Sequence, residues 1–333
     1  MTYLFGNTYS EAQRLSNIFT IISPLLALAL IGYLIAKRQW LNDAQLSGLS
    51  KVTFVIFIPA FLFYRMATAD LASVLNPLPI AAFYLPVLTC FALGFILNHW
   101  LHPEYKKHRR GSAVFALGSS YSNNVIVGLP LLLLVIGDQA LPTIFLIVTF
   151  HSAMLFALTS AIAASQANST QAKNSKRGIN WLAFIKQTIT NPLVFGILSG
   201  LLVNAAGIQI PALVARPLDM LGQPAITLAL IALGSSIAKY DIRGERRFIA
   251  LASTIKLMLL PLLVYLTAKH ALALDTLIVQ VLVILSACPT GVNAYLIAQQ
   301  HQVHRKAVAS SVVVSTVASV MTLPLWLVWL NLV

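Results

Sequence analysis

The sequence predicts an all-α polytopic membrane protein, and three observations lead to this fold class. Hydrophobic residues make up 58% of the 333 residues, charged residues make up only 9%, and the mean hydropathy is +0.83. A soluble domain carries about 25% charged residues, so this chain is too poor in charge to cover a water-facing surface. The apolar stretches are also long and continuous rather than alternating, which argues against a transmembrane β-barrel.

Ten apolar stretches are long enough to cross a bilayer, which takes roughly 20 helical residues. An even number of spans also agrees with the distribution of basic residues described next. We place the ten predicted spans at 17–36, 46–66, 77–101, 111–136, 140–165, 181–206, 213–238, 247–268, 273–299 and 307–331.

The basic residues set the orientation of these spans. Sixteen of the 22 Lys and Arg residues lie in the loops after spans 1, 3, 5, 7 and 9, and four lie on the opposite side. Because cytoplasmic loops are rich in Lys and Arg, both termini are predicted to be extracytoplasmic, in an inner or plasma membrane. The same distribution explains the net charge of +13 without a nucleic-acid partner.

A polar linker at 166–180 divides the chain into two halves, 1–165 and 181–333. The linker is predicted to be cytoplasmic, with five spans on each side of it. Because each half holds an odd number of spans, a repeat of one half in the other must be inverted in the membrane. The residues that recur at an offset of 167 or 168 are Pro24 and Pro192, Gly32 and Gly200, Thr149 and Thr316, and Ser152 and Ser319.

The two most polar stretches inside the predicted spans lie at matching places in the two halves. They read GSSYSNNVIVGLP at 118–130 and SACPTGVNAYLIA at 286–298. Proline disrupts a helix, and Asn, Ser and Thr offer partners to freed backbone groups. Lipid cannot satisfy open backbone, so the pair predicts broken helices 4 and 9 that line a transport site. The N-termini of the half-helices there favour an anionic ligand.

The residues of these stretches resemble a known family. The pattern of Asn123 followed by Gly128 and Pro130, with PTGVNAY at 289–295, is similar to the motifs of the auxin efflux carrier family. That family includes bacterial malate and malonate carriers and the plant PIN-type auxin exporters. The resemblance implies a crossover fold like that of sodium/proton antiporters. Spans 1, 2, 6 and 7 would form a scaffold, and spans 3–5 and 8–10 would form a moving transport unit.

The resemblance also implies the site residues. Asn123 would contact the anion near the crossing of spans 4 and 9. The predicted substrate site consists of Ser122, Asn123, Asn124, Thr290, Gly291, Asn293 and Tyr295. Gly128, Pro130 and Pro289 are predicted to shape the crossover. We expect no catalytic residue, cofactor or metal.

Two ionisable residues inside spans require an explanation, because a charge there costs about 2.5–3.5 kcal/mol on insertion scales. Lys256 could hold the open carbonyl end of a broken helix, attract the anion, or extend to the interface. His151 could titrate during transport or be a neutral core histidine. All nine carboxylates fall in loops or near span ends, which disfavours coupling through an acidic pair at the crossover.

The predicted function is secondary transport of small organic anions, such as malate, malonate or auxin-like acids, by alternating access. The membrane potential, worth about 2.3 kcal/mol per charge per 100 mV, or a proton would drive it. A sodium-coupled organic-anion symporter on the same fold is the alternative. An enzyme is not expected, because the chain has no HExxH motif or paired Asp. The expected partners are the substrate and the lipid bilayer, and a homodimer stays open.

Overall fold

The computed structural model describes residues 11–69, 77–101, 109–164, 190–239 and 246–333. Most of these residues are helical, and the described ranges contain no strand apart from one isolated bridge. The predicted all-α class is therefore confirmed for this part of the chain. The predicted linker at 166–180 lies outside the described residues.

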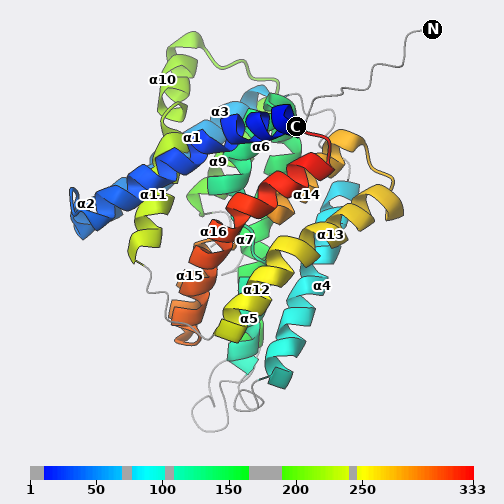
Figure 1. Ribbon diagram of the computed structural model, residues 1–333. Coiled ribbons are helices and arrows are strands. Elements are labelled where there is room, and N and C mark those ends of the chain that lie inside the picture. The colour runs from blue at the N-terminus through cyan, green and yellow to red at the C-terminus, as the bar shows by residue number, and fades with distance from the viewer. Residues whose placement is uncertain (1–10, 70–76, 102–108, 165–189, 240–245) are drawn as a thin grey trace, which may run out of the picture.

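The first half of the chain forms helices α1 to α7, with short π-helical or 3-10 segments between some of them (Figure 1). Their bounds are α1 (Glu11–Lys37), α2 (Asp43–Val52), η1 (Thr53–Phe57), α3 (Ile58–Thr68), α4 (Leu78–Leu101), α5 (Arg109–Ser120), η3 (Asn124–Gly128), α6 (Leu129–Val135), η4 (Asp138–Ala140) and α7 (Leu141–Ala164).

The second half forms helices α9 to α16. Their bounds are α9 (Pro192–Ala205), α10 (Ala212–Gly222), α11 (Ala225–Lys239), α12 (Arg246–Thr254), η5 (Ile255–Leu259), α13 (Leu260–Tyr265), η6 (Leu266–Ala271), α14 (Thr276–Ala287), α15 (Asn293–His301) and α16 (Arg305–Trp329).

Six helical runs within the described ranges are long and apolar enough to cross a membrane. They are Asp43–Thr68, Leu78–Trp100, Asp138–Ala163, Ala212–Lys239, Arg246–Ala271 and Arg305–Trp329. These runs coincide with predicted spans 2, 3, 5, 7, 8 and 10, so the chain crosses the membrane several times. The other four predicted spans contain the shorter apolar helices Ser23–Lys37, Asn124–Val135, Pro192–Ala205 and Thr276–Ala287. The count of ten spans stays a prediction.

A π-helical turn precedes a proline in three of the apolar helices. The prolines are Pro59, Pro130 and Pro261, and each is the second residue of the α-helix that follows the turn. Proline has no N–H and displaces the carbonyl four residues before it, so the hydrogen-bond ladder lengthens locally. The backbone N–H of Ile58, for example, donates to the Thr53 carbonyl five residues earlier. These prolines bend spans without ending them.

Helix α1 packs along α11, and glycines bring the two backbones into contact. A Cβ atom at Gly32 would overlap the main chain of Ile231, and one at Gly234 would overlap the main chain of Ala29. Small residues of this kind allow close approach of helices inside a membrane, where packing replaces the hydrophobic effect.

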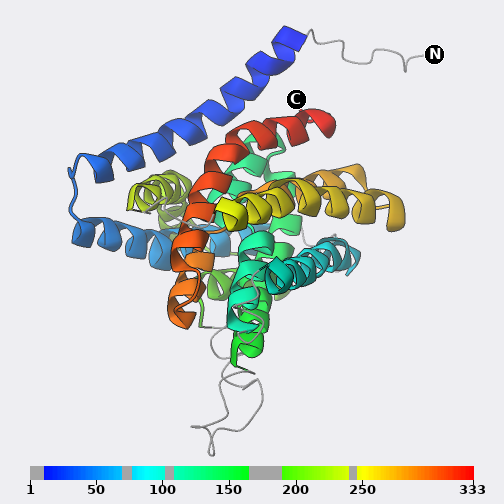
Figure 2. The same cartoon turned by 60° about the horizontal axis from the view of Figure 1, so that its bottom comes forward.

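Helix α3 packs along α9 in the same way. A Cβ at Gly196 would lie 2.6 Å from the Pro59 carbonyl oxygen, and one at Gly200 would lie 2.5 Å from that of Phe63. These four glycines therefore bring the backbone of α1 against that of α11 and the backbone of α3 against that of α9. Figures 1 and 2 show α1, α2 and α11 on the opposite side of the molecule from α4, α12 and α13.

The most enclosed helices are α5 and α14. Every residue from Gly111 to Ser120 in α5 is buried, and so is every residue from Val281 to Ala287 in α14. A helix that is enclosed on all sides faces protein rather than lipid. Protein groups can therefore satisfy any backbone that is opened at the ends of these two helices.

Candidate functional site

The first interruption lies between α5 and η3. Helix α5 ends at Ser120, and η3 begins at Asn124. Asn123 leaves the helical conformation with φ −82° and ψ 63°, which redirects the chain. The Asn123 carbonyl then accepts hydrogen bonds from the backbone N–H groups of Val127 and Gly128, at 3.2 and 3.1 Å. The second half-helix therefore starts on Asn123.

The second interruption lies between α14 and α15. Helix α14 ends at Ala287, and α15 begins at Asn293. Cys288 is extended, with φ −58° and ψ 149°, because a residue before proline avoids the helical region. Pro289 itself has no N–H with which to continue the helix. Both stretches that the sequence marks as interrupted thus contain a break in the helix.

The two interruptions pair with each other. Ser122 and Thr290 form an isolated antiparallel β-bridge. The backbone N–H of Asn123 donates to the Pro289 carbonyl across 2.9 Å. The backbone N–H of Gly291 donates to the Tyr121 carbonyl across 3.0 Å. These bonds satisfy backbone groups that the helix breaks leave open, as a membrane interior requires.

Side chains from two further helices hold the outward backbone N–H groups of the bridge. Ser122 donates its N–H to His151 Nε2 in α7 across 2.9 Å. Thr290 donates its N–H to Ser315 Oγ in α16 across 3.0 Å. Helix α7 is predicted span 5, which follows the interruption in span 4. Helix α16 is predicted span 10, which follows the interruption in span 9. The two halves of the chain therefore use the same arrangement with an imidazole in one and a hydroxyl in the other.

In each half-helix that precedes a break, a side chain closes the C-terminal end by donating a hydrogen bond to one of its last carbonyls. The Gly118 carbonyl in α5 accepts from Thr290 Oγ1 across 3.0 Å. The Ser286 carbonyl in α14 accepts from Lys256 Nζ. Gly118 and Ser286 stand 168 residues apart, as do Gly32 and Gly200. One carbonyl near the end of each half-helix thus accepts from a side chain, which is a neutral hydroxyl in one half and an amino group in the other.

Lys256 is completely enclosed. The side chain is 0% exposed, so it does not extend to the interface, and its contact with Ser286 is the carbonyl contact considered from the sequence. The ion pairs found among the described residues lie elsewhere and join Arg65 to Asp138 and Lys239 to Asp43. In the described part of the chain, Lys256 therefore has no ion pair with a carboxylate.

Five buried polar atoms at the interruptions have no hydrogen-bond partner among the described residues. They are Ser122 Oγ, Asn123 Nδ2, Asn124 Nδ2, Asn124 Oδ1 and His151 Nδ1. Each of the four side chains is at most 5% exposed. Buried polar groups are nearly always hydrogen-bonded, so this cluster marks a place where a ligand or water completes the bonding.

The other predicted substrate residues divide into two pairs. Thr290 and Gly291 are buried at the bridge, but the Thr290 N–H and hydroxyl already have partners. A Cβ at Gly291 would overlap the Tyr121 ring, so glycine is required there. Asn293 is exposed and donates its amide to Tyr121 Oη across 3.4 Å, and Tyr295 is half-buried on α15.

The residues predicted to shape the crossover lie beside it. Gly128 is the last residue of η3, and a Cβ there would come within 2.9 Å of the Leu285 side chain and 3.1 Å of Cys288 Sγ. Pro130 is the second residue of α6 and directly follows the π-helical turn η3, whose wider hydrogen-bond ladder accommodates its missing N–H. The glycine therefore lets the end of α14 pass close to the start of the second half-helix.

One residue at the interruptions was not identified from the sequence as part of the site. The Ser315 hydroxyl accepts from the Thr290 N–H and also donates to the Val312 carbonyl of its own helix, and the second bond alone is what a serine in an apolar helix usually makes. The sequence did place Ser315 in the span that follows a break, and His151 has the corresponding place in the first half. The spacing alone does not say which side chain of that span points to the bridge.

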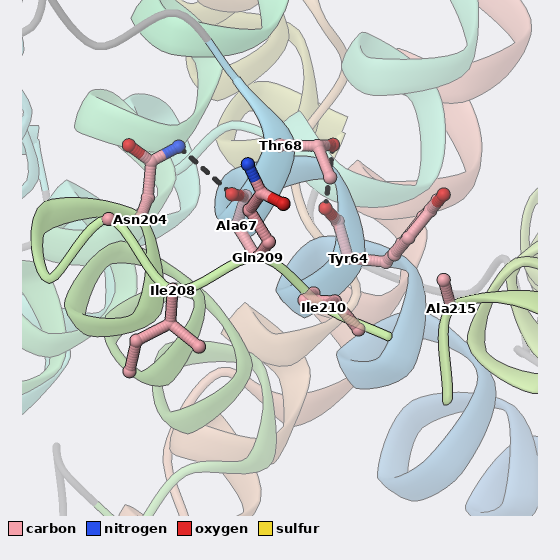
Figure 3. A pocket seen from close by; sticks show the side chains of 9 residues that line it. Tyr64, Ala67, Thr68, Asn204, Ile208, Gln209, Ile210 and Ala215 are labelled. Carbon is pink, nitrogen blue, oxygen red and sulfur yellow. Dashed lines mark hydrogen bonds between the residues drawn. The ribbon is translucent and has the colours of Figure 1, made fainter. Parts of the chain in front are cut away.

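A separate cavity of about 350 Å³ lies between α3, α9 and the segment that leads into α10 (Figure 3). Asn204 lines it beside Tyr64. The Asn204 Nδ2 atom donates to three carbonyls at the end of α3, those of Met66, Ala67 and Ala69. Because this donor is engaged by the helix end, we assign the cavity to the packing of α3 against α9.

Several membrane-crossing helices, two paired helix breaks and a cluster of open polar atoms where they meet are features of a membrane transporter. The family model of membrane transport proteins matches residues 17–327. The match covers most of the chain. The chain therefore belongs to this family, which is the auxin efflux carrier family indicated by its motifs.

Several relatives match at low identity. A candidate malonate transporter of Rhizobium meliloti (strain 1021) is 24% identical over 322 residues, which cover 92% of this chain and 94% of the relative. The uncharacterized transporter YfdV of Escherichia coli (strain K12) is 24% identical over 308 residues, covering 91% and 95%. Auxin efflux carrier component 1 of Arabidopsis thaliana is 26% identical over 136 residues, covering 40% of this chain and 22% of that protein.

Proposed function

We propose that this protein is a secondary transporter that moves small organic anions across the inner or plasma membrane by alternating access. The observation that carries the proposal is the cluster of open polar atoms where the two helix breaks pair. Breaks at corresponding positions of two halves mark the substrate site in many secondary transporters.

The open atoms suit a carboxylate. Asn123 Nδ2 and Asn124 Nδ2 are N–H donors, and Ser122 Oγ is able to donate as well. The second half-helix begins at the same residues, and its N-terminus carries partial positive charge and open N–H groups. Ionised oxygens accept hydrogen bonds roughly twice as strong as neutral ones. The site thus offers an anion several donors at once.

The acidic residues that the structure describes stand apart from this site. The carboxylates whose side chains the structure describes are all exposed, whereas the site is buried. They are Asp43, Asp138, Asp219 and Asp275. An anion at the site is therefore not opposed by any of these carboxylates at close range, which supports an anionic rather than a cationic substrate.

We further propose that the chain folds as ten spans in two inverted five-helix repeats, 1–165 and 181–333, that cross like the helices of sodium/proton antiporters. Gly32 and Gly200 support this, since each lies against the main chain of a helix from the other half. The bridge residues Ser122 and Thr290 also stand 168 residues apart, the offset of the glycines.

The proposed repeat gives the two sets of helices different tasks. The glycine-joined helices α1–α3 and α9–α11 would form a scaffold, and α4–α7 with α12–α16 would form the unit that carries the substrate. The excess of basic residues in the odd-numbered loops supports an extracytoplasmic position for both termini. Movement of one unit against the other would expose the site to each side in turn.

The substrate class that we propose is small carboxylates of the malate and malonate type, with auxin-like acids as further members. A relative of matching length is named for malonate, which supports this class. The inside-negative membrane potential favours export of an anion by about 2.3 kcal/mol per charge per 100 mV. Coupling to a proton would instead support uptake.

A sodium-coupled organic-anion symporter on the same fold is the second candidate, and one atom favours it. Asn124 Oδ1 is a buried oxygen without a partner in the described residues, and the carbonyls of the interruptions lie beside it along the chain. Unwound backbone carbonyls coordinate sodium in transporters of related design. Dependence of transport on sodium separates this candidate from the first.

The experiment that tests the proposal is transport by the purified full-length protein in liposomes. Currents on a solid-supported membrane and uptake of labelled substrate would be measured with malonate, malate, succinate and indole-acetate, with and without sodium and a pH gradient. We expect saturable, sodium-independent transport that falls at least tenfold in Asn123→Ala. Asn123→Asp should abolish it, because a carboxylate there would repel the anion.

A matched control is Asn42→Ala, which removes an exposed asparagine at the start of α2. This variant should transport at the wild-type rate per folded molecule. Sodium-dependent transport would replace the first candidate with the symporter. Folded wild-type protein that moves none of the four acids, by current or by label, would overturn the proposed substrate class.

A further inference from the structure

The two equivalent half-helix ends are closed by different chemical groups. The Thr290 hydroxyl closes Gly118, and the Lys256 amino group closes Ser286. A neutral hydroxyl is therefore sufficient to satisfy a carbonyl at this position of the fold. A lysine is not needed there for hydrogen bonding alone, so its buried amino group requires another reason.

The position of Ser122 points to that reason. Ser122 is the partner of Thr290 in the bridge and stands 168 residues before it, which is also the separation of Gly118 and Ser286. In the proposed repeat, the Ser122 hydroxyl would therefore be expected to close Ser286 as Thr290 closes Gly118. Lys256 occupies the Ser286 carbonyl instead, and Ser122 Oγ is buried without a partner among the described residues. Because Lys256 bonds the Ser286 carbonyl, the Ser122 hydroxyl stays available to a ligand beside the donors Asn123 and Asn124.

The charge of Lys256 has no full counter-charge in the described residues. Its contact there is the uncharged Ser286 carbonyl, and the ion pairs of the described residues do not include it. The C-terminal end of α14 supplies only about half a negative charge. A buried cation without an anionic partner is strongly unfavourable. An anionic ligand nearby would therefore be stabilised by this charge, and it would stabilise the charge in turn.

We propose that Lys256 is the fixed counter-ion of the transported anion and that it makes the site select fully charged carboxylates over their esters and amides. In this assignment the ammonium stays on the Ser286 carbonyl, acts on the ligand through the low-dielectric interior, and leaves the Ser122 hydroxyl to donate to a ligand oxygen. The assignment rests on the proposed function and adds the charge requirement of the same site.

The decisive variant is Lys256→Gln. Glutamine keeps an N–H donor for the Ser286 carbonyl and removes the charge, so closure of the helix end and charge compensation are separated. Binding to the purified full-length protein would be measured by calorimetry at fixed ionic strength with malonate, monomethyl malonate and malonamide, which carry two, one and no negative charges at neutral pH. We expect Lys256→Gln to weaken malonate at least tenfold, monomethyl malonate less, and malonamide hardly at all.

Two further variants complete the test. Lys256→Arg keeps the charge and should retain the preference for malonate over malonamide. Lys269→Gln is the matched control, because Lys269 is an exposed lysine in η6 of the same helical run. It should bind all three ligands as the wild type does.

Each result decides the matter. Unchanged malonate binding in Lys256→Gln, or an equal loss for all three ligands, overturns the counter-ion assignment while the proposed function stands. A wild-type protein that binds no carboxylate overturns the proposed function as well. If Lys256→Gln does not fold, Ser122→Ala provides the second test. It should fold normally, since its hydroxyl has no other partner in the part of the chain that the structure describes, and it should weaken malonate binding several-fold. Normal binding in Ser122→Ala would refute the assignment.

Discussion

The Nε2 atom of His151 accepts a hydrogen bond from the backbone N–H of Ser122 across 2.9 Å. A ring nitrogen that accepts carries no hydrogen, so a neutral His151 holds its hydrogen on Nδ1. The ring is 2% exposed and stacks on Tyr121 with centroids 4.9 Å apart and an interplanar angle of 15°. His151 therefore serves the first interruption as a backbone acceptor, a role that a protonated ring could not fill.

His151→Ala should destabilise the protein. The substitution leaves the buried Ser122 N–H without an acceptor, which costs about 1–3 kcal/mol, and it also removes ring packing. The unfolding temperature of the detergent-solubilised protein should fall, and transport should fall with it. His151→Gln places an amide oxygen near the same N–H and should recover part of the loss. An unfolding temperature in His151→Ala equal to that of the wild type would contradict this role.

Ser315→Ala should have the corresponding effect on the second interruption. The Thr290 N–H would lose its acceptor at 3.0 Å, again at a cost of about 1–3 kcal/mol. Ser315→Thr keeps the hydroxyl and should unfold close to the wild type. Ser199→Ala is the control, because the Ser199 hydroxyl bonds carbonyls of its own helix. If Ser199→Ala proves as harmful as Ser315→Ala, the specific role of Ser315 is refuted.

Gly234→Ala should separate α1 from α11. The added methyl group would overlap the Ala29 main chain, and such overpacking typically costs about 1–3 kcal/mol. Gly48→Ala is the matched change, because a Cβ at Gly48 meets nothing within 4 Å in helix α2. Alanine there should raise stability by up to about 1 kcal/mol through its better helix propensity. Thermal unfolding of both variants measures the contrast, and equal shifts would show that the close approach is unimportant.

Asn204→Asp should destabilise the end of α3. The amide that now donates to three backbone carbonyls would become a carboxylate that repels them. We expect a loss of about 1–3 kcal/mol, the range for an unsatisfied buried group. Asn204→Ala removes the donor without adding charge and should lose less. Chemical unfolding followed by intrinsic fluorescence checks the order, and a reversed order would argue against the closure of α3 by Asn204.

The sequence was most informative where one physical rule dominated. Long apolar runs located helices because lipid tolerates little else, and Pro289 with the polar residues around Ser122 located both breaks. The sequence was least informative about partners across the bridge. That His151 and Ser315 turn toward the two breaks depends on how α7 and α16 are rotated, and packing sets this rotation rather than local propensity. Burial of Lys256 could not be decided either, because a long side chain nine residues into a span can reach the interface as readily as the interior.

The predicted site residues also differ in how far the sequence could establish whether their polar groups are available to a ligand. Asn123 and Asn124, which the motif predicted as site residues, carry buried polar atoms without a partner among the described residues, and their role in binding stays a prediction. Thr290 looked equally suitable, yet both of its polar groups are consumed by the fold. Whether a polar residue beside a break serves structure or ligand depends on the carbonyl opposite it, and a single sequence does not reveal that neighbour.

The two helix breaks are held by different side-chain groups, and this difference bears on the relative energies of the inward-open and outward-open forms. With the inverted repeat that we propose, a perfectly duplicated carrier would be degenerate, since a two-fold rotation would interchange its inward-open and outward-open forms and give them equal energy. Here an imidazole faces one bridge amide and a hydroxyl faces the other, while a lysine closes one helix end and a threonine closes the other. In the proposed carrier these differences would lift the degeneracy and give the empty protein a preferred resting side.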